Sequence, residues 1–192
     1  MIDSSGIKDE GEGEWNGRKH GGPKRRLWHK IPIRIEEETP EICAVKVTSS
    51  SIGGAPMLLD LLDQIPPDEE IGCVTGDGAC DTFKYHDAIA ARNAHAVIPP
   101  RKNVKLWKPY TPGARARNEA VRSSQYLGRA LWWQVTRYHR RSRVETKIHF
   151  VKLLGQRLSA HDFDRRVAEI QIPAAILNGF TALGIPKTEA GS

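Results

Sequence analysis

The chain has 192 residues, of which 39% are hydrophobic, enough for one domain with a substantial core. Its formal net charge is +6, and it has neither an apolar run of transmembrane length nor a signal-peptide pattern, so neither a membrane span nor a secretory leader is expected. Three cysteines, at positions 43, 73 and 80, make no CxxC pair and no even framework. A reduced, soluble, cytoplasmic protein is predicted, and a disulfide scaffold is excluded.

The first half of the chain predicts strands that alternate with helices. The polar, Gly-rich stretch 9–26 predicts a loop or wide hairpin, without a phosphate-binding glycine motif. Ile31, Ile33 and Ile35 then alternate as in a strand, in which Pro32 favours an edge position. The elements predicted next are a strand over 42–48, a helix over 55–65, a strand over 70–81 that ends in an acidic turn, a helix over 83–93 and a short buried strand over 95–100.

From Ala114 onward the pattern is helical, with interruptions near Thr136 and around 159–161. Pro173 lies inside the last helical pattern, where a proline costs about 3 kcal/mol and kinks or breaks a helix. The alternation of strands and helices predicts an α/β or α+β domain.

Basic residues gather in one segment of the chain. Residues 101–143 contain twelve Lys and Arg and one acid, Glu119, so this segment carries +11 and the rest of the chain −5. Three of the five Trp and three of the four Tyr lie in the same segment. Cations among aromatic rings suit a nucleic acid, because cations bind phosphates and rings stack on bases. The alternative is a basic amphipathic helix whose aromatic residues pack inward.

Glu145 is the only acid between Ala120 and His161. Tyr138, Arg141, Glu145 and Lys152 fall on a helix stripe about 60° wide at the helical period. An apolar face runs beside that stripe, which places Glu145 at the rim of the core, partly desolvated. It is either a metal ligand or one half of an ordinary ion pair with Arg141, and spacing does not decide between the two.

Asp3 and Asp77 are the other candidate acids. Each is expected at the C-terminal end of a strand, before a glycine-containing turn, although only Met1 and Ile2 precede Asp3, which would leave it on a short, frayed strand. Asp81 is expected to cap the following helix. Two strand-end aspartates and a helical glutamate can hold two Mg²⁺ ions for phosphodiester chemistry. Three histidines, at positions 20, 29 and 139, lack ligand spacing and are predicted as surface or loop residues.

Three passages resemble the DDE transposases of bacterial insertion sequences, and the resemblance covers essentially the whole chain. They are "IDSSGIK" (2–8), "VTGDGACD" (74–81) and "YHRRSRVETKIHFVK" (138–152). The last fits the family signature Tyr-x₂-Arg-x₃-Glu-x₆-Lys at every fixed position. The family usually has an aromatic residue where Cys80 stands. An N-terminal DNA-binding region and a complete first strand normally precede the first aspartate, so a truncated transposase is expected, with residues 1–192 as a single catalytic domain.

The resemblance implies an RNase H-like fold, with a central mixed sheet flanked by helices and a helical C-terminal part. It implies cleavage of DNA at transposon ends and strand transfer to target DNA, with two Mg²⁺ ions (Mn²⁺ as a substitute) and a homo-oligomer in the synaptic complex. The catalytic and metal-binding residues would be Asp3, Asp77 and Glu145. The DNA-binding residues would be the signature members Tyr138, Arg141 and Lys152, with Arg137, Arg140 and Arg143 of the same basic segment. The alternatives are a catalytically inactive DNA-binding remnant and a stand-alone metal-dependent nuclease.

Overall fold

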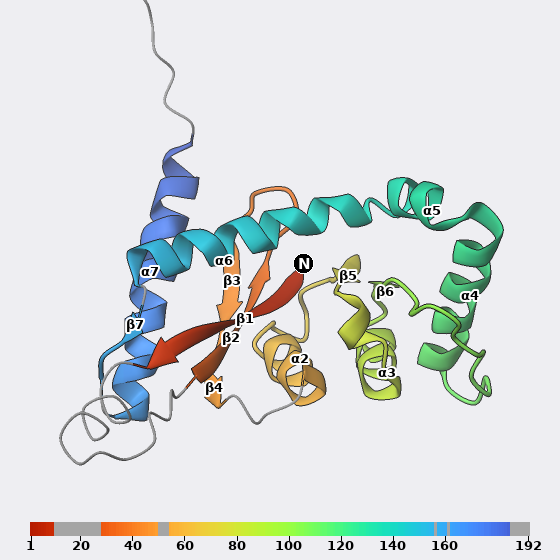
Figure 1. Ribbon diagram of the computed structural model, residues 1–192, viewed down its shortest axis with the longest axis horizontal. Coiled ribbons are helices and arrows are strands. Elements are labelled where there is room, and N and C mark those ends of the chain that lie inside the picture. The colour runs from red at the N-terminus through yellow and green to blue at the C-terminus, as the bar shows by residue number, and fades with distance from the viewer. Residues whose placement is uncertain (10–27, 50–53, 156, 161, 185–192) are drawn as a thin grey trace, which may run out of the picture.

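A computed structural model describes residues 1–9, 28–49, 54–155, 157–160 and 162–184 (Figure 1). The strands are β1 (Ile2–Asp9), β2 (Trp28–Ile35), β3 (Ile42–Val45), β4 (Thr48–Ser49), β5 (Cys73–Thr75), β6 (His95–Val97) and β7 (Arg157–Leu158). The α-helices are α2 (Gly54–Asp63), α3 (Phe83–Ala91), α4 (Pro112–Leu127), α5 (Arg129–Val135), α6 (Ser142–Leu154) and α7 (Phe163–Leu183), and the 3₁₀ helices are η1 (Gly78–Cys80) and η2 (Tyr138–Arg141). The loop predicted over 9–26 lies almost wholly outside the described residues.

The described strands form two hydrogen-bonded sheets. The larger part of the strand system is a mixed sheet with the order β3-β2-β1-β7 and β4 beside β2, and the smaller is a parallel pair of β5 and β6. In the larger part β1 and β2 are antiparallel, whereas β1 and β7 are parallel. Helices cover both faces of the sheet, and the last third of the chain is mainly helical. The predicted α/β class, with a central mixed sheet and a helical C-terminal part, is confirmed.

Two apolar cores lie on opposite faces of the sheet. Helices α6 and α7 cover the face of β1 and β2 that carries Ile7, Ile31 and Ile33. Helices α2 and α3 pack on the other side, in a second core that includes Ile2, β5 and β6. Figure 1 shows α6 crossing the sheet on one side, with α2 and α3 on the other. Strand β1 therefore contributes to both cores, and its alternate residues face different helices.

The N-terminal residue is part of the sheet. Met1 is 7% exposed, and its ammonium donates to the Ile35 carbonyl at 2.7 Å while the Ile35 amide donates to the Met1 carbonyl at 2.9 Å. Burial lowers the pKa of this ammonium. The prediction that Asp3 lies on a short, frayed strand is wrong, because β1 has eight residues and pairs with β2 from its start.

Strand β2 lies inside the sheet, so the prediction of an edge position from Pro32 is also wrong. Met1 and Ile35 exchange backbone bonds, so alternate residues of β2 face β1 and even-numbered ones such as Pro32 face the other side. On that side pairing is interrupted between Val45 and Thr48, and the Pro32 carbonyl accepts from the Lys46 amide. The missing N–H of the proline therefore falls where the neighbouring strand is broken.

Helix α7 runs through Pro173 without a break, from Phe163 to Leu183. Pro173 and Ala174 are both buried, and Ala174 belongs to the core that α7 shares with α6. Packing therefore offsets the lost backbone bond, and the predicted break is absent. The interruptions predicted near Thr136 and around 159–161 are confirmed by the ends of α5 and the start of α7. Across the described ranges, no helix is long and apolar enough to cross a membrane.

Candidate active site

Asp3 is the second residue of β1, on the strand face that also carries Ser5 and Ile7. Ile7 is in the core beneath α6, so the alternation of the strand directs Asp3 and Ser5 toward that helix as well. The prediction that Asp3 ends a strand is wrong. The "SSG" stretch, expected as a turn, continues β1 because residues from Ile2 to Lys8 pair with β2.

Helix α6 lies across β1 because Val144, Ile148 and Val151 are buried in the shared core. This packing brings the polar stripe of the helix to the strand. Arg141, just before the helix, contacts Asp3 Oδ2 with Nη2 at 3.0 Å and Glu145 Oε1 with Nη1 at 2.5 Å. Three turns along, Lys152 Nζ donates to the Ser5 hydroxyl at 2.5 Å. The helical stripe predicted from the spacing therefore faces β1.

Glu145 is more exposed than expected. Its side chain is 53% exposed, against 14% for Asp3 and 17% for Arg141, so the prediction of a partly desolvated carboxylate is wrong for Glu145 and describes Asp3 instead. The ion pair with Arg141, which was the alternative to a metal ligand, is present. Because the same guanidinium also reaches Asp3, the pair joins two acids that are far apart in the sequence.

Asp77 lies two residues after the end of β5, in the predicted turn, and caps the N-terminus of the 3₁₀ helix η1. Its Oδ1 accepts from the Ala79 amide at 2.9 Å and from the Cys80 amide and thiol at 3.3 Å each. Burial, with the nearby Asp77 carboxylate, raises the pKa of the Cys80 thiol to about 12. The thiol is therefore protonated at neutral pH and serves as a donor to Asp77.

Tyr138 lies within electrostatic range of all three acids. Burial raises the pKa of the Tyr138 hydroxyl; Arg141 opposes this, and Asp77, Glu145 and Asp3 each raise it further. The Tyr138 ring also lies 5.6 Å from the Trp133 ring, centroid to centroid. Ion pairs of Arg141 therefore join Asp3 to Glu145, and Asp77 acts on Asp3 and Tyr138 through its charge.

Burial also raises the pKa of the Asp3 carboxyl, although Arg141 and the Ser4 amide act against it and Asp77 adds to it. As the pH rises, the unfolded chain therefore loses this proton first, and the ionised carboxylate lowers the free energy of unfolding once the pH exceeds the folded-state pKa. Below the unfolded value of 3.8 the effect is absent.

We expect the substitution Asp3→Asn to raise the melting temperature of the metal-free protein at about pH 7 and to leave it unchanged at about pH 3, because asparagine removes a charge that the folded site disfavours. Thermal unfolding followed by circular dichroism at both pH values checks this. An equal gain at the two pH values would show that packing, rather than charge, is responsible.

Asp81 has a different position from the predicted one. Thr82, not Asp81, caps α3, with its hydroxyl accepting from the Tyr85 amide. The Asp81 side chain is 3% exposed and accepts from Arg117 Nε at 2.9 Å, Arg117 Nη2 at 3.0 Å and His86 Nε2 at 3.2 Å. Burial alone would raise the pKa of Asp81, but the hydrogen bonds from His86 and Arg117 have the larger effect and lower this pKa. Sequence reasoning missed this buried cluster, since His86 and Arg117 carry no motif.

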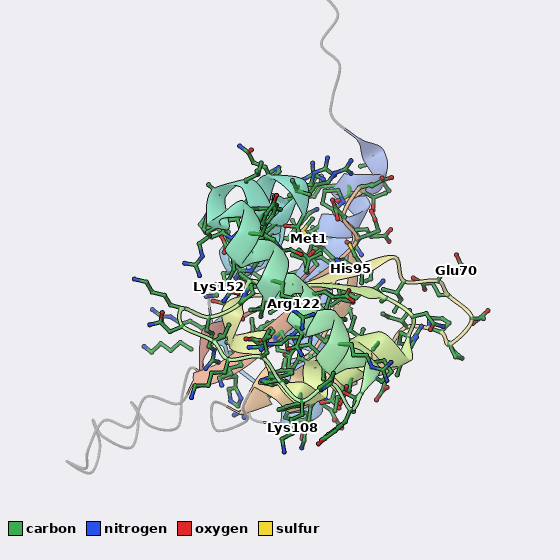
Figure 2. The ribbon with its side chains drawn as sticks, turned by 90° about the vertical axis from the view of Figure 1, so that its right-hand side faces the viewer. Met1, Glu70, His95, Lys108, Arg122 and Lys152 are labelled. Carbon is green, nitrogen blue, oxygen red and sulfur yellow. The ribbon has the colours of Figure 1, made fainter. Side chains whose placement is uncertain are left out.

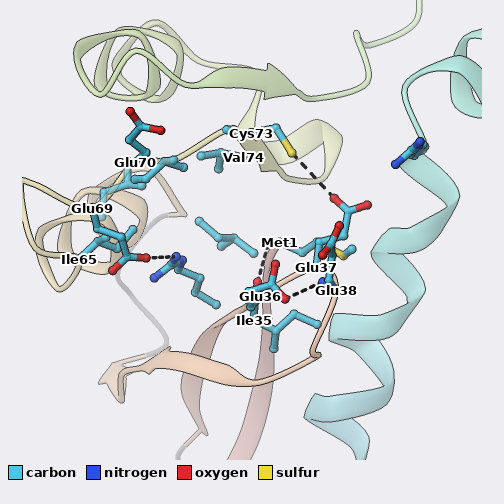
Figure 3. Close-up of a pocket in the computed structure, with 16 residues that line it drawn as sticks. Met1, Ile35, Glu36, Glu37, Glu38, Ile65, Glu69, Glu70, Cys73 and Val74 are labelled. Carbon is cyan, nitrogen blue, oxygen red and sulfur yellow. Dashed lines mark hydrogen bonds and ion pairs between the residues drawn. The ribbon is translucent and has the colours of Figure 1, made fainter.

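The three additional arginines do not face the acids together. Arg140 Nη1 contacts Glu37 Oε1 at 2.8 Å, and Arg143 Nη1 donates to the Glu37 carbonyl at 2.5 Å. Arg137 is exposed, has a left-handed backbone (φ 56°) and lines a cavity of about 310 Å³. Figure 3 shows this cavity with Met1 and the carboxylates of two loops around it.

The predicted histidines fall in three different places. His20 lies outside the described residues, and His139 is exposed in η2, as predicted. His29 is a member of strand β2, opposite Ile7, and not a loop residue.

Across the described residues, no group of three or more His, Cys, Asp or Glu side chains is placed to hold a metal ion. Instead, the Arg141 guanidinium lies between Asp3 and Glu145, and its buried Nε has no partner in the part of the chain that the structure describes. Carboxylate oxygens are the donors that Mg²⁺ takes in proteins, and a cation already neutralises two of these acids. By charge and donor type, the three residues fit a divalent ion.

The sequence was compared with family models and with solved structures. A family model described as the transposase DDE domain matches residues 1–178. No solved structure matches the chain.

Proposed function

The chain belongs to the DDE transposase family, whose members act on DNA, and from this premise we propose that Asp3, Asp77 and Glu145 are its catalytic, metal-binding carboxylates. The observation that carries the proposal is the double contact of Arg141 with Asp3 and Glu145, at 3.0 and 2.5 Å. This contact joins β1 to the start of α6, and the Asp77 carboxylate is close enough to raise the pKa of Asp3.

The proposed reaction is cleavage of DNA at transposon ends, followed by strand transfer to target DNA. Two Mg²⁺ ions, or Mn²⁺ in their place, would activate the attacking water or 3′-hydroxyl and stabilise the leaving oxygen. The residues of the chain do the rest. Asp3, Asp77 and Glu145 would hold the ions, and Arg141, which contacts Asp3 and Glu145 in the free protein, would bind a DNA phosphate. Tyr138 and Lys152 position the strand on either side.

The proposal has one close rival, a DNA-binding remnant without catalytic activity. The exposure of Glu145 and the engagement of Arg141 with both acids favour it, because a site closed by its own arginine holds metal more weakly. A supercoiled plasmid that carries the terminal repeats of the element, incubated with Mn²⁺, separates the two. Nicking by the wild-type chain supports the transposase. Binding without nicking supports the remnant, and nicking without preference for the repeats supports a stand-alone nuclease.

The DNA-binding role of Arg137, Arg140 and Arg143 also belongs to the proposal. We expect the triple substitution to glutamine to lower the salt dependence of DNA affinity, by about one unit of log–log slope for each arginine that binds a phosphate. Fluorescence anisotropy with a labelled duplex across a salt series measures the slope.

Glu37 supplies the control, since its carboxylate and carbonyl hold Arg140 and Arg143 in the free protein. The substitution Glu37→Gln should raise affinity, because Arg140 no longer has to leave a carboxylate to reach a phosphate. A triple variant with the slope of the wild type would show that these arginines only brace the loop after β2.

A further inference from the structure

Residues 101–110, here called the basic loop, join β6 to α4 without forming a helix or a strand. The loop carries four exposed cations, Arg101, Lys102, Lys105 and Lys108. No acid occurs between Asp87 and Glu119, so nothing within the loop neutralises them. In the described part of the chain, neither Lys102 nor Lys105 has a carboxylate partner. Figure 2 looks onto the side of the molecule where Lys108 and Arg122 lie.

Two buried side chains of α4 hold this loop in place. Asn118 is 3% exposed, and its amide group makes both possible bonds with the Trp107 backbone: Oδ1 accepts from the Trp107 amide at 2.9 Å, and Nδ2 donates to the Trp107 carbonyl at 2.8 Å. Arg117, also 3% exposed, donates to the Lys105 carbonyl at 2.7 Å. The loop has no backbone hydrogen bonds of a helix or strand. The side-chain bonds from Asn118 and Arg117 take their place and hold the backbone that carries the lysines.

One of these two anchors, Arg117, also ties the loop to the turn that carries Asp77. Arg117 binds Asp81, which lies four residues after Asp77, with two parallel bonds. The Arg117 guanidinium also lies 4.1 Å from the Trp107 ring centroid, and that ring stacks on Phe83 at 3.8 Å. At the start of the loop, Arg101 Nε donates to the carbonyl of Gly78, the residue after Asp77, at 3.0 Å. Side-chain hydrogen bonds therefore connect the basic loop to the turn that carries Asp77.

We propose that the basic loop binds the phosphate backbone of DNA on the Asp77 side of the site, and that Arg117 and Asn118 are positioning residues for it. That the ligand is DNA rests on the proposed function, whereas the cationic surface itself is seen in the structure independently of that function. Uncompensated cations on a fixed backbone bind a polyanion without first paying to order the loop. Tyr110, 79% exposed beside Lys108, adds an aromatic ring that can stack on an unpaired base.

The basic loop and helix α6 would then contact different parts of the bound DNA. Lys152 and Arg141 lie at β1, on the α6 side of the site. The basic loop lies on the other side, attached to the Asp77 turn by Arg101. A strand that reaches the three acids would be held by cations on both sides of them, which fixes its direction across the site.

The double substitution Lys102→Gln/Lys105→Gln tests the surface. Anisotropy with a labelled duplex in the presence of EDTA, where no cleavage occurs, should show the log–log salt slope reduced by about two units. The control is Lys46→Gln/Arg165→Gln, which removes the same charge from the segment between β3 and β4, where Lys46 pairs with Asp60, and from α7, and should leave the slope close to that of the wild type. An equal reduction in both variants would overturn the proposal, since only net charge would then matter.

The substitution Asn118→Ala tests the positioning role. It should speed hydrogen exchange at the Trp107 amide and weaken DNA binding while Lys102 and Lys105 remain. Faster exchange with unchanged binding would overturn that role. Nicking by the wild-type chain is measured separately. If the wild-type chain does not nick DNA but the loop substitutions still weaken DNA binding, only the proposed function is contradicted. If the chain nicks DNA but the loop substitutions leave DNA binding unchanged, only this inference is contradicted.

Discussion

We expect the single substitutions Asp77→Asn and Glu145→Gln each to lower metal-dependent nicking by at least about 10²-fold, because each removes a charge from the group that would bind the ions. Asparagine at position 77 keeps the bonds to the Ala79 and Cys80 amides, so η1 retains its cap. Loss of activity in this variant therefore reports charge and not a disrupted turn. Initial rates of plasmid nicking with Mn²⁺ measure the effect.

The matched control for these variants is Glu119→Gln, an exposed acid on α4 whose side chain forms no hydrogen bond or ion pair among the described residues. It changes the net charge by the same amount and should nick at the wild-type rate. DNA affinity in EDTA should be unchanged or slightly higher in the two site variants, since they remove negative charge beside a phosphate. Nicking at full rate by both site variants would remove Asp77 and Glu145 from the mechanism.

The substitution Arg117→Met should lower the free energy of unfolding by about 3–5 kcal/mol, because it leaves the Asp81 carboxylate buried without its main partner. Both side chains are nearly inaccessible, at 4% for Arg117 and 3% for Asp81. The Lys105 carbonyl loses its donor at the same time. Urea unfolding followed by tryptophan fluorescence gives the change, with the midpoint read at a constant slope.

Two further variants separate the charge from the packing. The double variant Asp81→Asn/Arg117→Met removes both charges and should recover part of the stability. The substitution Arg122→Met, on the exposed face of the same helix, should change it by about 0.5 kcal/mol or less. If the double variant were as unstable as Arg117→Met alone, the buried charge would not be the cause.

The pH dependence of this cluster follows from the lowered pKa of Asp81. An acid whose folded-state pKa lies below its unfolded value contributes stability that is fully present above the unfolded value and is lost as the pH falls toward the folded one. The cluster therefore stabilises the protein at neutral pH and fails only in strong acid. Asp3, with its raised pKa, has the opposite sign.

Local sequence patterns account for part of the site. The helical period placed Glu145 and Lys152 on one face, because α6 is a regular helix whose apolar residues lie beside that stripe, and Arg141 stands just before it at the end of η2. The glycine-flanked Asp77 was expected at the end of a strand and is found there. Both depend on contacts within a few residues, which the sequence carries directly.

Other features depend on partners that are distant in the sequence. "SSG" was expected as a turn but is a strand, because β2 supplies a backbone partner for each residue. Asp81 was expected as a helix cap but is buried, because Arg117, 36 residues later, neutralises it.

By itself the sequence determined the α/β class, the basic segment and the family signature, because periodicity, charge and spacing are written in consecutive residues. Only the tertiary structure decided which cations are free. Arg140 and Arg143 contact Glu37, Arg117 is buried against Asp81, and Arg141 joins Asp3 to Glu145. The role of each arginine depends on the group that it contacts in the folded chain. Composition alone predicts the same DNA-binding role for every arginine of the segment.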